Sequence, residues 1–410
     1  MKPLKQTIRM ATLMIGLLAL STAAVTPTLA EENVGQLVQT APSVVTVAGN
    51  GLFGEDNGAA LSASFRTPMS IAMHPDGMVY IADTKSHLIR KLFQGNISTF
   101  AGFTFSEDSK GFPIGTLYDG AANLSVFQNP QGLSLDSQGN LYVADTGNHS
   151  IRKITSLWVS TIGGDGVMGN RDGKNGKDAR FHSPADLAVA PDGTVYVADT
   201  LNHVIRKIAV DGTVTTLNSP SKRVVELSPG DIEPAGDFQD GPLESAKFNE
   251  PSGICLDATG NLYVSDTGNQ RIRYIDLQQK TVTTVAGHTS SKYASNSLYM
   301  DGSYADGDPA MAQFQFPRGI AMTADGGLVI ADSMNHVVRY LHDGKVSTLT
   351  GTLQDSKPET ISTTDAGASP AVLFQLPVDV AVDISGAIWV VDAFSNTVLQ
   401  MHINKNDAGR

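Results

Sequence analysis

One segment of the chain recurs six times, and this repetition constrains the fold more than any other feature. The clearest copy is residues 128–154, QNPQGLSLDSQGNLYVADTGNHSIRKI. Each copy opens with a Phe-x-x-Pro motif and places an aspartate at the end of its second apolar run. A regular internal repeat predicts one supersecondary unit per copy. The six aspartates lie 54 to 67 residues apart, at Asp83, Asp145, Asp199, Asp266, Asp332 and Asp392.

The apolar pattern within a repeat predicts four short antiparallel strands. Residues 132–136 (GLSLD) alternate apolar and polar side chains, and residues 140–145 (NLYVAD) read as a second, more buried strand. Residues 149–154 and 159–162 complete the set, with Gly and Asn in the turns between strands. Six such units predict an all-β fold, a six-bladed β-propeller of four-stranded antiparallel blades.

The two ends of the repeat region are complementary. A fourth-strand motif, VVTVAG at 44–49, precedes the first full repeat, and the last repeat stops after its third strand near residues 401–403. We therefore expect the N-terminal strand to complete the sixth blade and close the ring. A closed ring leaves no open sheet edge for aggregation, and we expect a monomer.

The motifs Pro-x-Gly-(Ile/Leu)-Ala, GN(L)YVADT and NHxIRK resemble those of NHL repeats. The resemblance covers about residues 44–403. It implies a propeller, but it does not specify an activity, because propellers are scaffolds that carry many different sites.

The N-terminal residues have the pattern of a secretory signal peptide. Three basic residues precede an apolar run at 10–20, and Thr28-Leu29-Ala30 resembles a cleavage site. The run is short against the roughly 20 residues that span a bilayer, although a retained anchor is the alternative. We expect a signal peptide at 1–30, a leader at 31–43, the propeller at 44–403 and a tail at 404–410. The expected location is outside the cell, at its surface or in a periplasm, with no membrane span after cleavage.

Charge and cysteine content narrow the function further. The chain has a formal net charge of −12, and loss of residues 1–30 would bring it near −15. Nucleic acids and anionic lipids need clustered basic surface, so we expect neither as a partner. The single cysteine, Cys255, cannot form an internal disulfide, and its place in an apolar first strand predicts a buried, unreactive thiol.

Several polar residues recur once per blade, which predicts a structural role for them. The Asp-to-Arg pairs, such as Asp145 with Arg152, recur too regularly to form one active site. The histidines also share one repeat position, so they should be spread around the ring, whereas zinc needs its ligands about 2 Å from one point. These histidines are His87, His149, His203 and His336.

The residue after each opening proline should face the mouth of the central channel. In peptide-amidating lyases with similar repeats, two blades place a zinc-binding histidine there, and no residue at this position of the chain is a zinc ligand. Arg318 is the only charged residue of the set, and the aromatic Phe316 lies two positions before it. Arg318 could bind an anionic group of a ligand or pair with nearby carboxylates. The six residues are Met69, Gln131, Ala185, Ser252, Arg318 and Val378.

One position further along, Asp186 and Asp379 stand in the third and sixth blades, on opposite sides of the ring. We take Arg318, Phe316, Gln131, Ser252, Asp186 and Asp379 as the candidate binding residues. The two aspartates are also candidates for a Ca²⁺ site, since calcium prefers carboxylate and carbonyl oxygens. A second candidate is the acidic group Asp301, Asp306 and Asp308, for which a solvated loop is the alternative. No other cofactor is expected.

These observations favour binding over catalysis. The turns after the second strands and the connections between blades share one face, and loops on a rigid scaffold often carry function. We expect a secreted module that binds a protein, a peptide or a cell-surface glycan through this loop-bearing face. The alternative is a metal-dependent hydrolase or lyase that acts at the channel mouth.

Overall fold

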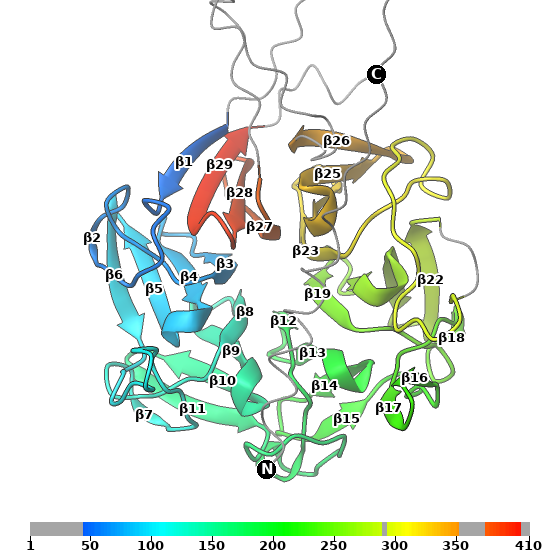
Figure 1. Ribbon diagram of the computed structural model, residues 1–410, viewed down its shortest axis with the longest axis horizontal. Helices are drawn as coiled ribbons and strands as arrows, with labels where there is room; N and C mark the ends of the chain where they lie inside the picture. The colour runs from blue at the N-terminus through cyan, green and yellow to red at the C-terminus, as the bar shows by residue number, and fades with distance from the viewer. Residues whose placement is uncertain (1–43, 289–292, 352–373, 403–410) are drawn as a thin grey trace, which may run out of the picture. The chain divides into compact units, whose positions relative to one another are not determined.

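Six small antiparallel sheets stand around a central channel in the computed structural model, as the repeats predict (Figure 1). The structure describes residues 44–288, 293–351 and 374–402. The predicted signal peptide, the leader and the C-terminal tail lie outside these residues. Within them, no helix is long and apolar enough to cross a membrane.

Three of the blades have four strands, with the first strand nearest the channel (Figure 1). The third blade consists of β12 (Asp186–Val189), β13 (Val195–Asp199), β14 (Val204–Ile208) and β15 (Val214–Thr216). The fifth consists of β23 (Pro317–Met322), β24 (Leu328–Asp332), β25 (Val337–His342) and β26 (Lys345–Gly351). The sixth consists of β27 (Pro377–Val382), β28 (Ala387–Asp392), β29 (Thr397–His402) and β1 (Val44–Ala48).

The other three blades carry a fifth strand of two residues on the outer edge, which the sequence did not predict. The first blade consists of β3 (Pro68–Met73), β4 (Val79–Asp83), β5 (Leu88–Phe93), β6 (Asn96–Ala101) and β2 (Gly58–Ala59). The second consists of β8 (Pro130–Leu135), β9 (Leu141–Asp145), β10 (Ser150–Thr155), β11 (Trp158–Gly163) and β7 (Gly120–Ala121). The fourth consists of β19 (Pro251–Leu256), β20 (Leu262–Asp266), β21 (Arg271–Asp276), β22 (Thr281–Ala286) and β18 (Gly241–Pro242).

In the second and fourth blades, an aspartate just before the short strand holds it in place. The Asp119 carboxylate accepts the backbone N–H of Thr161 on β11 at 3.0 Å, and Asp240 accepts that of Thr284 on β22 at 3.1 Å. Each carboxylate thereby fixes its connection alongside the fourth strand. The chain then makes two more residues of ladder pairing with that strand.

In the first five blades, the turn between the second and third strands is a short 3₁₀ turn that ends on a residue with a left-handed backbone, such as His149 with φ of 51°. The His149 side chain accepts, at Nδ1, the backbone N–H of Ser183 in the next blade at 3.1 Å. The repeated histidines therefore have the expected structural role, because they join neighbouring blades. These turns are η1 (Thr84–Ser86), η2 (Thr146–Asn148), η4 (Thr200–Asn202), η5 (Thr267–Asn269) and η6 (Ser333–Asn335); η3 (Gly176–Asp178) lies in a connection.

Apolar side chains fill the interfaces between blades, where six separate clusters form the core. Each cluster contains one phenylalanine from an opening Phe-x-x-Pro motif. All six of these rings are at most 1% exposed, so the opening motif is a core anchor for each blade interface. They are Phe65, Phe127, Phe181, Phe248, Phe314 and Phe374.

A buried arginine on the third strand links the parts of each blade from the first to the fifth. In the second blade, Arg152 donates to Asp145 on β9 at 2.5 Å and to Asp119 at 2.9 Å. Its guanidinium also lies 4.9 Å from the centre of the Phe127 ring. One side chain therefore connects the second strand, the opening motif and the connection beside the fourth strand. The same pairing joins Arg90 to Asp83, Arg206 to Asp199, Arg273 to Asp266 and Arg339 to Asp332.

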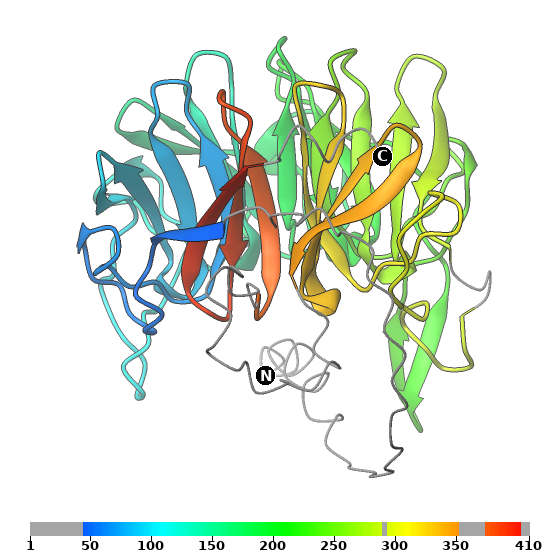
Figure 2. The ribbon, with the colours of Figure 1, turned by 90° about the horizontal axis from the view of Figure 1, so that it is seen from above.

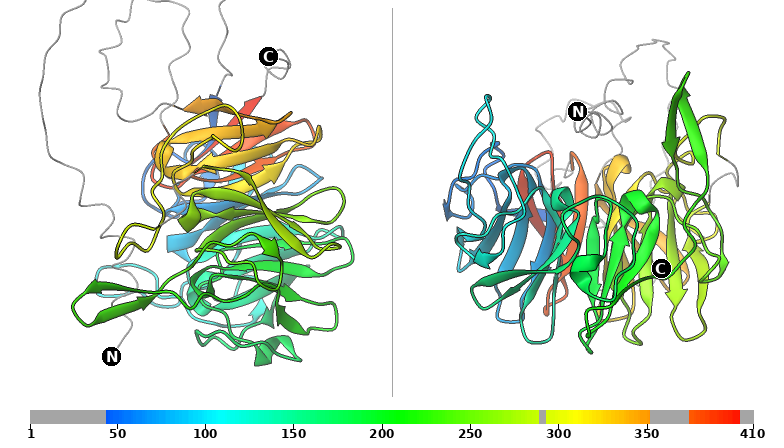
Figure 3. Two further views of the ribbon diagram at one scale, coloured as in Figure 1. Left: turned by 90° about the vertical axis from the view of Figure 1, so that its right-hand side faces the viewer. Right: turned by 90° about the horizontal axis from the view of Figure 1, so that it is seen from below.

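The connection between the third and fourth blades contains an additional hairpin, β16 (Val224–Ser228) and β17 (Asp231–Pro234), that the sequence did not predict. It extends beyond the body of the ring on one face (Figures 2 and 3). Its turn, Ser228-Pro229-Gly230-Asp231, has the composition of a tight turn between two runs that contain β-branched residues. The hairpin could have been predicted from this composition.

The predicted closure of the ring is confirmed. The N-terminal strand β1 pairs antiparallel with β29, with Val44 opposite Met401 and Ala48 opposite Val398. A side-chain hydrogen bond also joins the sixth blade to the first, because Asn396 accepts the backbone N–H of Thr67 at 2.9 Å. The two ends of the described chain therefore share the sixth blade.

We predict that deletion of residues 44–49 sharply lowers stability. The deletion exposes β29 as an unpaired edge and removes Ala48, which is fully buried. The melting temperature should fall by about 5 °C or more, since several kcal/mol of packing are lost. Deletion of residues 404–410 serves as the control. A deletion variant that melts with the intact protein and stays monomeric would contradict the closure argument.

Candidate functional site

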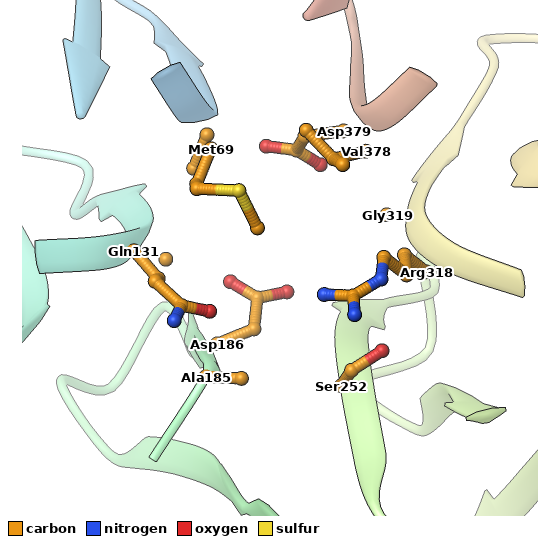
Figure 4. A pocket seen from close by; sticks show the side chains of 11 residues that line it. Met69, Gln131, Ala185, Asp186, Ser252, Arg318, Gly319, Val378 and Asp379 are labelled. Carbon is orange, nitrogen blue, oxygen red and sulfur yellow. The ribbon is translucent and has the colours of Figure 1, made fainter. Parts of the chain in front are cut away.

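The residues that follow the opening prolines meet at the channel, where they line one cavity (Figure 4). Its volume is about 20 Å³, which holds roughly one or two water molecules. Any larger ligand must therefore bind above the mouth and not within it. The lining residues are Met69, Ser70, Gln131, Gly132, Ala185, Asp186, Ser252, Arg318, Gly319, Val378 and Asp379.

Arg318 extends from the start of β23 into this cavity, between Ser252 and Asp186 (Figure 4). In the part of the chain that the structure describes, its guanidinium makes no hydrogen bond or ion pair. The suggested pairing with Asp186 or Asp379 is therefore absent. Burial lowers the pKa of Arg318, and the nearby charge of Glu250 opposes that effect. Arginine nonetheless stays charged at neutral pH, so the mouth presents a cation with free donors.

The candidate Phe316 is not part of the cavity lining but packs beside it. Its ring meets Tyr299 edge to face, with 5.2 Å between ring centres, and its backbone N–H donates to Gln270 at 2.5 Å. The Tyr299 hydroxyl donates to Glu250 at 3.1 Å. Tyr299 and Glu250 were missed in the sequence, because Tyr299 lies in an irregular connection that no repeat position marks.

Asp186 and Asp379 connect the innermost strands of neighbouring blades. Asp186 accepts the backbone N–H of Ile254 at 2.9 Å, and Asp379 accepts that of Ile71 at 3.0 Å. A Cβ on Gly132 would collide with Asp186, and one on Gly319 would collide with Asp379. The glycine in the blade before each of these aspartates is therefore required by close packing around the channel.

Both carboxylates have raised pKa values. Burial is the main cause, and it raises the pKa of Asp379 to about 6. For Asp186 the shift is upward as well, with burial first and the charge of Asp379 second. Two carboxylates that face one narrow channel disfavour each other's ionisation.

The described residues do not offer a good calcium site. Calcium takes six to eight oxygen ligands, whereas the mouth supplies two carboxylates that already accept backbone N–H groups. In the acidic connection, Asp306 pairs with the buried Arg339 at 2.7 Å and is committed to the blade. No group of three His, Cys, Asp or Glu side chains that could hold a metal occurs in the described ranges.

Cys255 lies on β19 and packs, half-buried, against the cluster between the fourth and fifth blades. Burial raises the pKa of its thiol, and the charges of Asp186, Asp257 and Asp379 act in the same direction. The reactive thiolate is therefore strongly disfavoured.

We predict that Cys255 reacts with a thiol reagent such as Ellman's reagent only after denaturation. The physical reason is the raised thiol pKa together with partial burial. The denatured protein gives the reference rate. Labelling of the folded protein at a similar rate would contradict this prediction.

We also predict that Asp379→Asn reduces the pH dependence of stability. The folded-state pKa of about 6 exceeds the usual 3.8, so the native state binds more protons than the unfolded chain between these values. Stability from this group is thus lost as the pH rises through that window. As the pH rises from about 5 to about 7.5, the free energy of unfolding of the variant should increase by about 1–3 kcal/mol relative to that of the natural protein. Urea unfolding at each pH measures this difference.

The matched control for this experiment is Asp192→Asn. Asp192 has a lowered pKa, because the backbone N–H of Thr194 donates to it. Its titration therefore falls below the measured window, and the pH slope should not change. Equal slopes for the natural protein and Asp379→Asn would refute the titration of Asp379.

Comparison with known proteins agrees with this architecture. The NHL repeat family model matches residues 127–154, 181–208 and 248–273. The chain is 28% identical over 311 residues to Protein SUPPRESSOR OF QUENCHING 1, chloroplastic, of Arabidopsis thaliana, covering 74% of this chain and 27% of that protein. It is 26% identical to human NHL repeat-containing protein 2, covering 70% of this chain and 40% of that protein. The chain thus spans less than half the length of these relatives.

A solved structure with the same fold is an auxiliary nutrient binding protein from Bacteroides ovatus. It superposes with a TM-score of 0.59 at 13% sequence identity, covering 90% of this chain and 78% of that chain. At this identity the likeness concerns the fold alone. The chain is a six-bladed β-propeller, and three of its six repeats match the NHL repeat family model.

Proposed function

We propose that the protein is a secreted binding module whose partner, a protein, a peptide or a glycan, sits on the loop-bearing face around the channel mouth. The observation that carries the proposal is Arg318, a cation with free donors at the centre of that face. Arginine and aromatic residues are favoured at binding hot spots, because they combine large contact area with directional polar groups. The aromatic pair of Phe316 and Tyr299 stands near this arginine.

The direction of the strands supports the choice of face. The blades are antiparallel, so the 3₁₀ turns and the connections between blades emerge on the same side as the channel mouth. The β16–β17 hairpin extends from one face of the ring (Figure 3). Loops on a rigid scaffold are a common place for recognition.

The narrow cavity and the charge of the chain favour one kind of contact. With a volume of about 20 Å³, the cavity admits only a small group of a partner, not a whole organic ligand. The chain as a whole has a net charge of −12, so a guanidinium at the mouth that no described residue pairs with is a local exception. An anionic group of the partner, such as a carboxylate, would complement it.

We predict that Arg318→Ala weakens partner binding by about 1–3 kcal/mol while the fold stays intact. The side chain makes no hydrogen bond or ion pair with the described residues, so its removal costs the blade no polar contact. The measurement is affinity capture of partners by the purified propeller, followed by titration of the captured partner. Circular dichroism checks the fold.

Lys280→Ala is the matched control, since Lys280 is an exposed cation in a turn between third and fourth strands, on the opposite face. It should bind as the natural protein does. Binding that survives Arg318→Ala but is lost with Lys280→Ala would move the site away from the channel mouth.

A further inference from the structure

A second cavity lies on the rim of the second blade and shares no residue with the channel mouth. Its volume is about 470 Å³, within the range of about 300–1,000 Å³ that small-molecule sites occupy. It lies where the connection into the second blade meets the connection that leaves it. The lining residues are Leu117, Tyr118, Asp119, Thr161, Gly164, Asp165 and Lys177.

The aromatic wall of this cavity is not required by the repeat. The Tyr118 backbone is fixed, because its carbonyl accepts from Arg152 at 2.8 Å, yet its side chain is 58% exposed. Each other arginine of the series donates to the carbonyl at the same repeat position, whatever the side chain. Those positions hold Asp56, Arg171, Gln239 and Ala305. A large exposed ring on a rigid backbone is thus particular to this blade.

The polar wall is close to electrically balanced. Asp119 pairs with Arg152 at 2.9 Å, and Asp165 pairs with Arg180 at 2.7 Å. The Lys177 ammonium lies 3.9 Å from Asp119, and its side chain is largely exposed. Two carboxylates would repel an anionic ligand, and Lys177 and the arginines would repel a cationic one. A neutral ligand with many hydroxyl groups can both donate to the carboxylates and accept from Lys177.

We propose that this cavity binds a neutral oligosaccharide, a function separate from that of the channel mouth. A sugar ring lies with its C–H groups over Tyr118, because the face of an aromatic ring carries negative charge. The inner oxygens, Asp119 Oδ1 and Asp165 Oδ2, are occupied by arginines, but Asp119 Oδ2 and Asp165 Oδ1 each accept only one backbone N–H. The sugar hydroxyl groups donate to these two outer oxygens and accept from the Lys177 ammonium. Leu117 adds apolar contact beside the ring.

The test is saturation-transfer NMR with the purified propeller and four neutral disaccharides: maltose, cellobiose, lactose and N,N′-diacetylchitobiose. Glucuronic acid and glucosamine serve as charged probes. At least one neutral disaccharide should bind through its C–H protons. Tyr118→Ala should weaken that binding about fivefold or more, and Lys177→Gln should weaken it too.

Phe105→Ala is the matched control, because Phe105 belongs to the same connection and is 57% exposed but lies outside the cavity. Both it and Arg318→Ala should bind the disaccharide as the natural protein does. The proposal is overturned if none of the neutral disaccharides binds, if only the charged probes bind, or if folded Tyr118→Ala binds unchanged. Loss of binding with Arg318→Ala alone would also overturn it, by placing the sugar at the mouth.

Discussion

The structure depends on a buried arginine that recurs in five of the six blades. A guanidinium with no exposed surface would be very costly if it were unpaired, and the cost is met here by two acidic or amide side chains, backbone carbonyls and a phenyl ring. The partners come from three parts of the blade: the second strand, the opening motif and the connection beside the fourth strand. Loss of one partner of such a pair typically costs about 3–5 kcal/mol. The arginine therefore fixes how strands, opening motif and connection fit together.

The sixth blade shows what replaces this arrangement. Leu399 stands at the repeat position of the arginine, and Asp392 accepts the backbone N–H groups of Gln375 and Leu376. This blade is instead completed by β1, which comes from the other end of the repeat region. Buried Asp–Arg ion pairs therefore hold five of the blades together, whereas the N-terminal strand β1 completes the sixth.

Contacts between blades determine how narrow the channel mouth is. Asp186 and Asp379 hold neighbouring inner strands together, and glycines opposite them allow that close approach. The strands consequently lie so near one another that little space remains between them. The interior of the ring is therefore structural at this level, and both proposed binding sites lie outside it, at the mouth and at the connections on the rim. Those connections vary between blades because the repeat uses mainly their backbone carbonyls and one polar side chain.

From the sequence we could predict the repeat, the all-β class, the six blades and the closure of the ring by the N-terminal strand, because strand periodicity and a regular repeat are local patterns. It also identified the residues that meet at the channel, since equal repeat positions become equal places around a ring. The tertiary structure was needed to show that Arg318 has no hydrogen bond or ion pair with the described residues, that Tyr299 and Glu250 stand near it, and that Tyr118 borders a cavity. These features depend on the paths of irregular connections, for which the sequence offers no period, and on distances between side chains that are remote along the chain.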